Sequence, residues 1–155
     1  IKQSGQKRRR YQLNITYYSA LNEDDDAYLL SRIVQFYTPG IPQVYYVGLM
    51  AGENDVELMK QGGDHRNINR HYYTREEIAE TVKRPMLQRM YQIMRFRNTY
   101  PAFNGDMTVD ENAEPGKLDI LWTKDEYWTR LEADFKTKQY TITYYDKDLD
   151  KTVIL

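Results

Sequence analysis

The sequence contains no cysteine, which excludes disulfide bonds and metal sites built from thiolates. The same lack fits a reducing compartment, and we expect a cytoplasmic location. No apolar run reaches the roughly 20 residues that a helix needs to cross a bilayer, and no signal peptide is visible, so we expect no membrane partner. An excess of one charge is also lacking. Because 22 basic residues stand against 23 acidic ones, we expect no nucleic-acid partner.

The 155 residues amount to about one domain, or to a small domain with a piece of another. Because the sequence starts with Ile1, we expect it to lie inside a longer polypeptide. Tyrosine is unusually frequent, with 15 copies. Its flat ring with a polar tip suits the surface of a sugar. It suits half-buried strands and helices as well, and packing is the plainer interpretation.

The first half of the sequence has a helix–strand–helix pattern. Residues 22–38 are predicted to form a helix that Asn22 caps and Pro39 stops. Three aspartates in its first turn, Asp24, Asp25 and Asp26, complement the positive end of the helix and indicate capping and solvated charge rather than catalysis. Residues 43–47 are β-branched and aromatic. We predict a short buried strand there, apolar on both faces like a parallel strand covered by helices.

A long polar loop is predicted at residues 48–73, within which residues 54–61 fit a short helix. Such long loops in compact domains are usually functional or disordered. Thr74 begins the next helix with a capping box, in which its hydroxyl binds the amide of Glu77 and the Glu77 carboxylate reaches back. Pro85 breaks or kinks that helix and starts a second one as its first residue.

From Asp106 onward the apolar period changes from that of helices to that of strands. Residues 127–135 alternate, and one face is predicted to carry Tyr127, Thr129, Leu131, Ala133 and Phe135. The other face carries Arg130, Glu132 and Asp134. The stretches "KLDILW", "YTITYYD" and "KTVIL" supply three more strands, so we predict a small antiparallel sheet with four strands.

A single parallel-type strand between helices cannot form a sheet by itself and needs neighbours from outside this sequence. We therefore predict an α/β fold class: the last helix–strand–helix part of a (β/α)8 TIM barrel, followed by a small C-terminal antiparallel β domain. The predicted divisions are residues 1–21, a loop after strand seven; residues 22–105, the end of the barrel; and residues 106–155, the β-sheet domain.

One stretch, "HRNINRHYY" at residues 65–73, is polar nearly throughout and can hydrogen-bond at almost every position. Arg66 and Arg70 stand four residues apart within it, and on these residues alone a pair of surface salt bridges is the plain interpretation. Its two histidines lie six apart with no third ligand beside them, which makes a weak metal site. We predict neither a metal nor any other cofactor.

In "PGIPQVYYVGL", "AGENDVEL" and "RNINRHYY" the sequence resembles the sucrose phosphorylases, a family within the α-amylase superfamily of (β/α)8 barrels (glycoside hydrolase family 13). The resemblance runs from about Tyr11 to Phe103. It implies that residues 65–73 follow the eighth barrel strand and that Tyr11 follows the seventh. Loops after barrel strands gather at the catalytic face.

The resemblance also implies a reaction, the transfer of a glucosyl group from sucrose to phosphate by two displacements at a pair of carboxyl groups. The family's catalytic carboxylates belong to earlier strands, so we expect no catalytic residue in this sequence. Arg66 is expected to bind the glucosyl group, and Tyr11 and Gln12 to bind phosphate and fructose. Arg70, His71 and Tyr72 are expected to support the loop. The expected partners are sucrose or a related α-glucoside, inorganic phosphate and the rest of the same barrel.

The sequence departs from the family pattern at two places. His65 stands where the family usually has glycine before the first arginine of the motif, which changes the freedom of the backbone. A basic run, Lys7 to Arg10, precedes Tyr11 where the family has an acidic loop residue. Such arginines favour an anionic acceptor such as fructose 6-phosphate or glycerate, but a solvated tail explains them equally well.

Three functional hypotheses follow. The leading one is the C-terminal part of a sucrose-phosphorylase-like glucosyltransferase, which supplies substrate-binding loops. The second keeps the enzyme class and changes the acceptor, to give a phosphorylase of sucrose 6-phosphate or glucosylglycerate. The third is a non-catalytic truncated fragment, because the chain alone is expected to turn over nothing.

Overall fold

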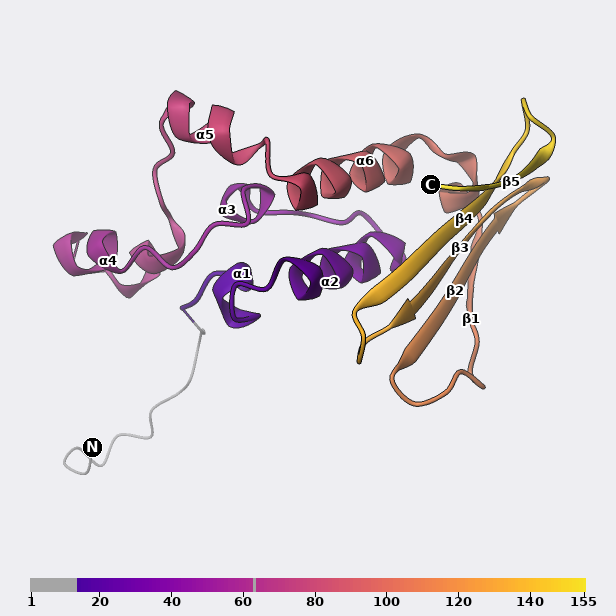
Figure 1. Ribbon diagram of the computed structural model, residues 1–155, viewed down its shortest axis with the longest axis horizontal. Helices are drawn as coiled ribbons and strands as arrows, with labels where there is room; N and C mark the ends of the chain where they lie inside the picture. The colour runs from indigo at the N-terminus through magenta and orange to yellow at the C-terminus, as the bar shows by residue number, and fades with distance from the viewer. Residues whose placement is uncertain (1–13, 63) are drawn as a thin grey trace.

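A computed structural model of the chain describes residues 14–62 and 64–155. Its helices come first and its sheet last, and the two long helices run side by side up to the sheet (Figure 1). The helices are α1 (Tyr17–Ala20), α2 (Asp25–Tyr37), α3 (Tyr46–Leu49), α4 (Val56–Gly62), η1 (His65–Asn69), α5 (Arg75–Thr81), α6 (Pro85–Thr99) and η2 (Pro101–Asn104). The strands are β1 (Asp106–Val109), β2 (Lys117–Lys124), β3 (Tyr127–Asp134), β4 (Gln139–Asp146) and β5 (Lys151–Ile154).

Helix α2 forms where the sequence predicts a helix and ends at Thr38, directly before Pro39. The predicted cap was wrong by two residues, because Asp24 rather than Asn22 accepts the hydrogen bond from the Ala27 amide, at 2.9 Å. Asn22 has a φ of 58° instead. Asparagine tolerates this left-handed region better than most residues, so it serves the turn before the helix.

The local predictions for α5 and α6 are confirmed. The Thr74 hydroxyl accepts from the Glu77 amide at 3.1 Å, and the Glu77 carboxylate accepts from the Thr74 amide at 2.6 Å. Pro85 is the first residue of α6, where its missing N–H costs no helical hydrogen bond. The short helix predicted at residues 54–61 is present as α4.

The sheet is an antiparallel meander in the order β1-β2-β3-β4-β5. Thr129, Leu131 and Ala133 are buried while Arg130 and Glu132 are exposed, which confirms the predicted alternation along β3. Phe135 departs from it: the residue lies beyond the end of β3 and is 48% exposed. Four strands were predicted and five are present, because β1 has only four residues and is mostly exposed, and so short an alternation was not recognised.

One hydrophobic core joins the helices to the sheet. Helices α2 and α6 pack against each other and against the inner face of the sheet, where Ile120, Leu131 and Ile142 lie opposite one another. Burying a large apolar side chain of this kind stabilises a fold by about 1.5–3 kcal/mol. Trp122 also donates its indole N–H to the Tyr37 carbonyl oxygen at 2.8 Å, so the sheet fixes the end of α2.

The strand predicted at residues 43–47 is not present. Residues 41–45 have no regular structure, and the chain then turns into helix α3. Val47 is buried as expected, but Ile41 is 90% and Tyr45 56% exposed. A parallel strand exists only by hydrogen bonding to neighbouring strands, and residues 14–62 and 64–155 place none beside this segment.

The stretch before α2, predicted to be a loop, contains the short helix α1, which the Thr16 hydroxyl caps. Within the described residues, no helix has both the length and the apolar character required to cross a bilayer.

Candidate functional site

The motif at residues 65–73 lies between α4 and α5, at the end of the molecule away from the sheet (Figure 1). Its first five residues form the 3-10 helix η1, which Asp64 caps by accepting from the Arg66 amide at 2.9 Å. The Arg70 amide closes the other end on the Asn67 carbonyl oxygen at 3.1 Å. The backbone of the motif is therefore organised, although most of its side chains reach the surface.

The two arginines of the motif differ in their surroundings. Arg70 places a guanidinium nitrogen 3.5 Å from the Asp64 carboxylate, across the 3-10 helix. Arg66 is exposed, and the part of the chain that the structure describes gives its guanidinium no hydrogen bond or ion pair. Within residues 14–62 and 64–155, therefore, nothing occupies its five N–H donors, which form the planar fork that suits carboxylates and sugar hydroxyls.

His71 joins the starts of two helices. Its Nδ1 lies 2.6 Å from the Asp55 carboxylate before α4, and its Nε2 lies 3.5 Å from the Glu77 carboxylate in α5. The Leu58 amide, followed by His71, lowers the pKa of Asp55. The Thr74 amide is the main cause of the lowered pKa of Glu77, to which His71 adds. Both carboxylates are therefore held in the charged form that an imidazole N–H can bind.

The tyrosines of the motif face different environments. Tyr72 is 75% exposed, whereas Tyr73 packs edge-on against the His71 ring with 4.6 Å between centroids. Burial raises the pKa of Tyr73 to about 12. A Cβ atom on Gly52 would lie 2.1 Å from the Tyr73 hydroxyl, so the glycine is what allows the ring to lie there.

Sequence reasoning missed two residues that organise this region, Asn54 and Asp55. The Asn54 side-chain oxygen accepts from the Thr16 amide at 2.8 Å, and the Asn54 amide donates to the Ser19 hydroxyl at 3.0 Å. The Asp55 amide donates to the Ile68 carbonyl oxygen at 2.7 Å. The only signal in the sequence was an Asn-Asp pair at the start of the helix predicted at residues 54–61, a pattern typical of a cap.

These contacts link Thr16 and Ser19 to the motif through Asn54 and Asp55. Tyr11 and Gln12, which we predict to bind substrate, lie outside the described residues. A hollow of about 480 Å³ opens beside Asn54, Asp55 and His71, and Arg66 does not line it. The full lining is Met50, Ala51, Gly52, Glu53, Asn54, Asp55, Val56, Glu57, His71, Tyr73, Thr81 and Arg84.

A buried arginine fixes the turn that leads into the site. Arg32 donates from Nε and Nη2 to the Tyr28 hydroxyl, at 3.0 and 2.9 Å, and that hydroxyl donates to the Gly48 carbonyl oxygen at 2.6 Å. A Cβ atom on Gly48 would lie 2.5 Å from Arg32 Nη2. Burial raises the pKa of Tyr28 in spite of the arginine. These hydrogen bonds hold α3 against α2. They therefore fix the position at which the polar segment after α3 begins.

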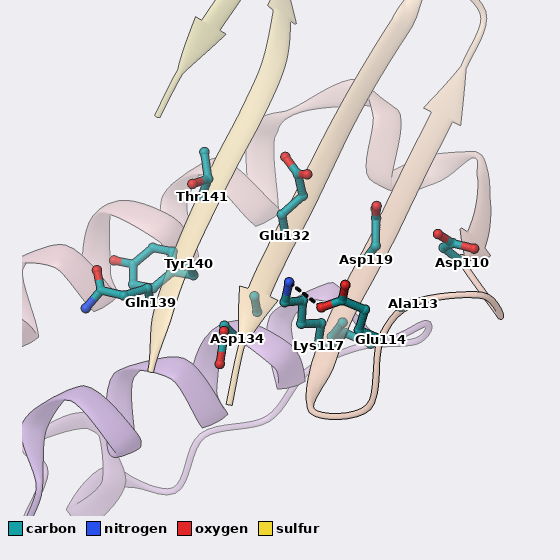
Figure 2. A pocket seen from close by; sticks show the side chains of 12 residues that line it. Asp110, Ala113, Glu114, Lys117, Asp119, Glu132, Asp134, Gln139, Tyr140 and Thr141 are labelled. Carbon is teal, nitrogen blue, oxygen red and sulfur yellow. Dashed lines mark ion pairs between the residues drawn. The ribbon is translucent and has the colours of Figure 1, made fainter. Parts of the chain in front are cut away.

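A second hollow, of about 350 Å³, lies on the sheet and is rich in carboxylates (Figure 2). Its acidic side chains are Asp110, Glu114, Asp119, Glu132 and Asp134. Glu114 pairs with Lys117 at 2.6 Å, and Arg130 pairs with Asp119 and, at 4.0 Å, with Glu132. The other two aspartates accept from backbone amides of tight turns. Turn caps and surface ion pairs account for this hollow, and nothing in it points to a ligand.

No family model matches the chain. It is 46% identical over 142 residues to the glucosylglycerol phosphorylase of Marinobacter adhaerens, and 52% identical over 139 residues to the sucrose phosphorylase of Bifidobacterium adolescentis. These alignments cover 92% and 88% of this chain but 29% and 25% of those proteins. The crystal structure of sucrose 6F-phosphate phosphorylase from Thermoanaerobacter thermosaccharolyticum matches with a TM-score of 0.89 and 48% identity, over 93% of this chain and 29% of that one. The chain thus spans less than a third of the length of each.

Proposed function

We propose, from the premise that this chain is related to the C-terminal portion of sucrose phosphorylases, that it is the C-terminal part of a glucosyl-transferring phosphorylase. The proposed reaction converts sucrose and phosphate to α-glucose 1-phosphate and fructose, with retention at the anomeric carbon. The observation that carries the proposal is the similarity to phosphorylases at 46–52% identity over about nine-tenths of the chain. A cytoplasmic location belongs to the same proposal.

The architecture of the parent protein is part of the proposal. Residues 1–21 would follow the seventh strand of a (β/α)8 barrel of the glycoside hydrolase family 13 type, residues 22–105 would complete the barrel, and residues 106–155 would form its C-terminal domain. Residues 41–45 support this placement, because they have no regular structure and carry the exposed apolar side chains of Ile41 and Tyr45. A neighbouring barrel strand would bury those side chains and pair with the backbone of this segment.

In the proposed reaction, this chain supplies residues that bind the substrate, and the rest of the barrel supplies the catalytic carboxyl groups. Retaining transfer needs two carboxyl groups about 5 Å apart across the glycosidic bond, and these would come from outside the chain. Arg66 would bind the glucosyl group, and its unoccupied donors among the described residues support that role. Tyr11 and Gln12 would bind phosphate and fructose.

Loop support is proposed for the remaining residues of the motif. Arg70 and His71 would hold the loop through Asp64 and Asp55, in agreement with the 3.5 Å and 2.6 Å contacts that they make with these carboxylates. Tyr72 would act at the surface of the loop, where its exposure leaves it able to contact another part of the barrel.

A second proposal keeps the reaction and changes the acceptor. The basic run from Lys7 to Arg10 favours an anionic sugar or acid, and the similar crystallised protein bears the name sucrose 6F-phosphate phosphorylase. Sucrose 6-phosphate and glucosylglycerate are therefore the alternative donors. A non-catalytic fragment remains the third reading, because the chain spans so little of each relative.

A chimera tests the proposal directly. The segment of the crystallised relative that corresponds to this chain is replaced by residues 1–155, and release of glucose 1-phosphate is measured with sucrose, sucrose 6-phosphate, glucosylglycerol and glucosylglycerate. We expect phosphorolysis of at least one donor, and the ranking identifies the acceptor that this chain favours. The unaltered relative is the control, and the 155-residue chain alone should release nothing. A folded chimera that releases no product from any of the four donors would refute the proposal.

A further inference from the structure

Asn54 and Asp55 are adjacent in the chain, yet they bind to two different loops. We propose that this pair sets the spacing between two segments: residues 14–19, on the acceptor side, and η1, which carries Arg66, on the glucosyl side. Asn54 is the positioning residue on the acceptor side, and Asp55 is the positioning residue on the glucosyl side. The inference rests on the proposed function, because it assigns roles to two residues that support the same site.

The acceptor side is held at Thr16. This residue is 4% exposed, and its amide donates to the Asn54 side-chain oxygen. The Thr16 hydroxyl in turn caps α1 by accepting from the Ser19 amide at 3.1 Å. The Asn54 amide donates a further hydrogen bond to the Ser19 hydroxyl. The Asn54 side chain therefore holds the backbone at Thr16, and Tyr11 and Gln12 precede this point in the sequence.

The glucosyl side is held at η1 and His71. The Asp55 amide donates to the carbonyl oxygen of Ile68, which belongs to the same 3-10 helix as Arg66. One oxygen of the Asp55 carboxylate faces His71, and the other accepts from the Leu58 amide at 2.8 Å, which fixes the carboxylate at the start of α4. The backbone that carries Arg66 is therefore tied to Asp55 at two places.

A single planar peptide bond joins these two anchors, so neither can move far without the other. The consequence is a fixed spacing between Thr16 and η1, the 3-10 helix that carries Arg66. Misplacement of a reacting group by about 1 Å can lower a rate by about 100-fold, so such spacing matters for transfer between two bound substrates. Substitution of Asn54 and substitution of Asp55 should then change the rates for the different donors in different ways.

The first test uses Asn54 variants in the active chimera. Asn54→Ala removes the acceptor of the Thr16 amide, whereas Asn54→Asp keeps an oxygen in that place. We expect Asn54→Ala to raise the KM for phosphate and to change the ratio of rates between sucrose and sucrose 6-phosphate by about tenfold. The kcat/KM for hydrolysis of α-glucosyl fluoride should change less than twofold, because this donor contains no fructose. Asn54→Asp should restore the normal ratio.

The second test uses Asp55→Ser, which keeps a hydroxyl to cap α4 but is too short to reach His71. We expect a fall in kcat/KM by about the same factor for every donor, α-glucosyl fluoride included. Lys60→Ala is the matched control, because it removes an exposed ion pair with Glu57 from the same helix and should leave all rates unchanged. The proposal is wrong if Asn54→Ala and Asp55→Ser give the same pattern across the donors, or if neither alters any rate.

Amide hydrogen exchange in the 155-residue chain gives a readout that does not depend on activity. The Thr16 amide should exchange slowly in the unaltered chain and in Asn54→Asp, and quickly in Asn54→Ala. The Arg70 amide, which donates within η1, should remain unchanged in all three. Equal protection of the Thr16 amide in Asn54→Ala would overturn the assigned role of Asn54. In that case an active unaltered chimera would still support the proposed function. An inactive chimera would count against both the proposed function and the roles of Asn54 and Asp55.

Discussion

At the scale of single residues, Thr129 shows how the core accommodates polar groups. It is fully buried in β3, donates to the Thr143 carbonyl oxygen at 2.9 Å and accepts from the Tyr37 hydroxyl at 2.8 Å. Burial raises the pKa of Tyr37 well above its usual range, so the phenol stays protonated and donates. The alternation of β3 predicted that Thr129 points inward. Its partner on α2 is far away in the sequence and could not be predicted, because only the packing of helix on sheet brings them together.

We expect Thr129→Val to lower the free energy of unfolding by about 1–3 kcal/mol, because it leaves the buried Tyr37 hydroxyl without a partner. The double variant Tyr37→Phe/Thr129→Val should cost less than the sum of the two single changes, since neither group is then left unpaired. Urea unfolding of the 155-residue chain measures all three values. Thr141→Val, at an exposed site of the neighbouring strand, is the control and should change little. Additive single effects would show that the hydroxyl pair is not coupled.

At the scale of elements, local signals in the sequence placed the longer helices and four of the five strands. The capping box at Thr74 and the proline at the start of α6 depend on residues close in the chain, and both were found from the sequence. The strand predicted at residues 43–47 failed because a parallel strand depends on neighbours that the sequence alone does not place. The same distinction explains the site: the motif was visible as a polar run, whereas Asn54 and Asp55 matter through contacts with residues 16, 19 and 68.

The junction between η2 and β1 supports a prediction at this scale. A Cβ atom on Gly105 would lie 1.9 Å from the Thr123 carbonyl oxygen, which belongs to the backbone of β2 and cannot move aside like a side chain. Gly105→Ala should therefore lower the free energy of unfolding by about 1–3 kcal/mol or more. Thermal and urea unfolding would measure the change.

The control for Gly105 is its neighbour in η2. Asn104 is exposed, and Asn104→Ala should change the stability by no more than about 0.5 kcal/mol. If Gly105→Ala proves as stable as Asn104→Ala, the close approach of the two backbones does not limit this junction.

At the scale of the whole molecule, the two ends of the folded structure differ in packing and polarity. One end is a sheet packed on helices around a continuous core. The other end carries the polar motif, the hollow beside His71 and exposed apolar side chains such as Ile41 and Tyr45. Composition and motif resemblance predicted a segment that works only with more polypeptide, and the sequence relationship to one part of larger phosphorylases agrees with this. The acceptor could not be predicted, because the proposed barrel would supply further side chains to the acceptor site.

The central claim is that the loop at residues 65–71 holds the glucosyl group through Arg66. The most direct measurement is kcat/KM for α-glucosyl fluoride hydrolysis by the active chimera with Arg66→Ala, beside Arg75→Ala as an exposed arginine outside the loop. Loss of the donors that hold the sugar should lower kcat/KM by about 100-fold or more in Arg66→Ala. Arg75→Ala should stay within about twofold of the unaltered chimera, as expected for an exposed side chain. Full activity in Arg66→Ala would contradict the account.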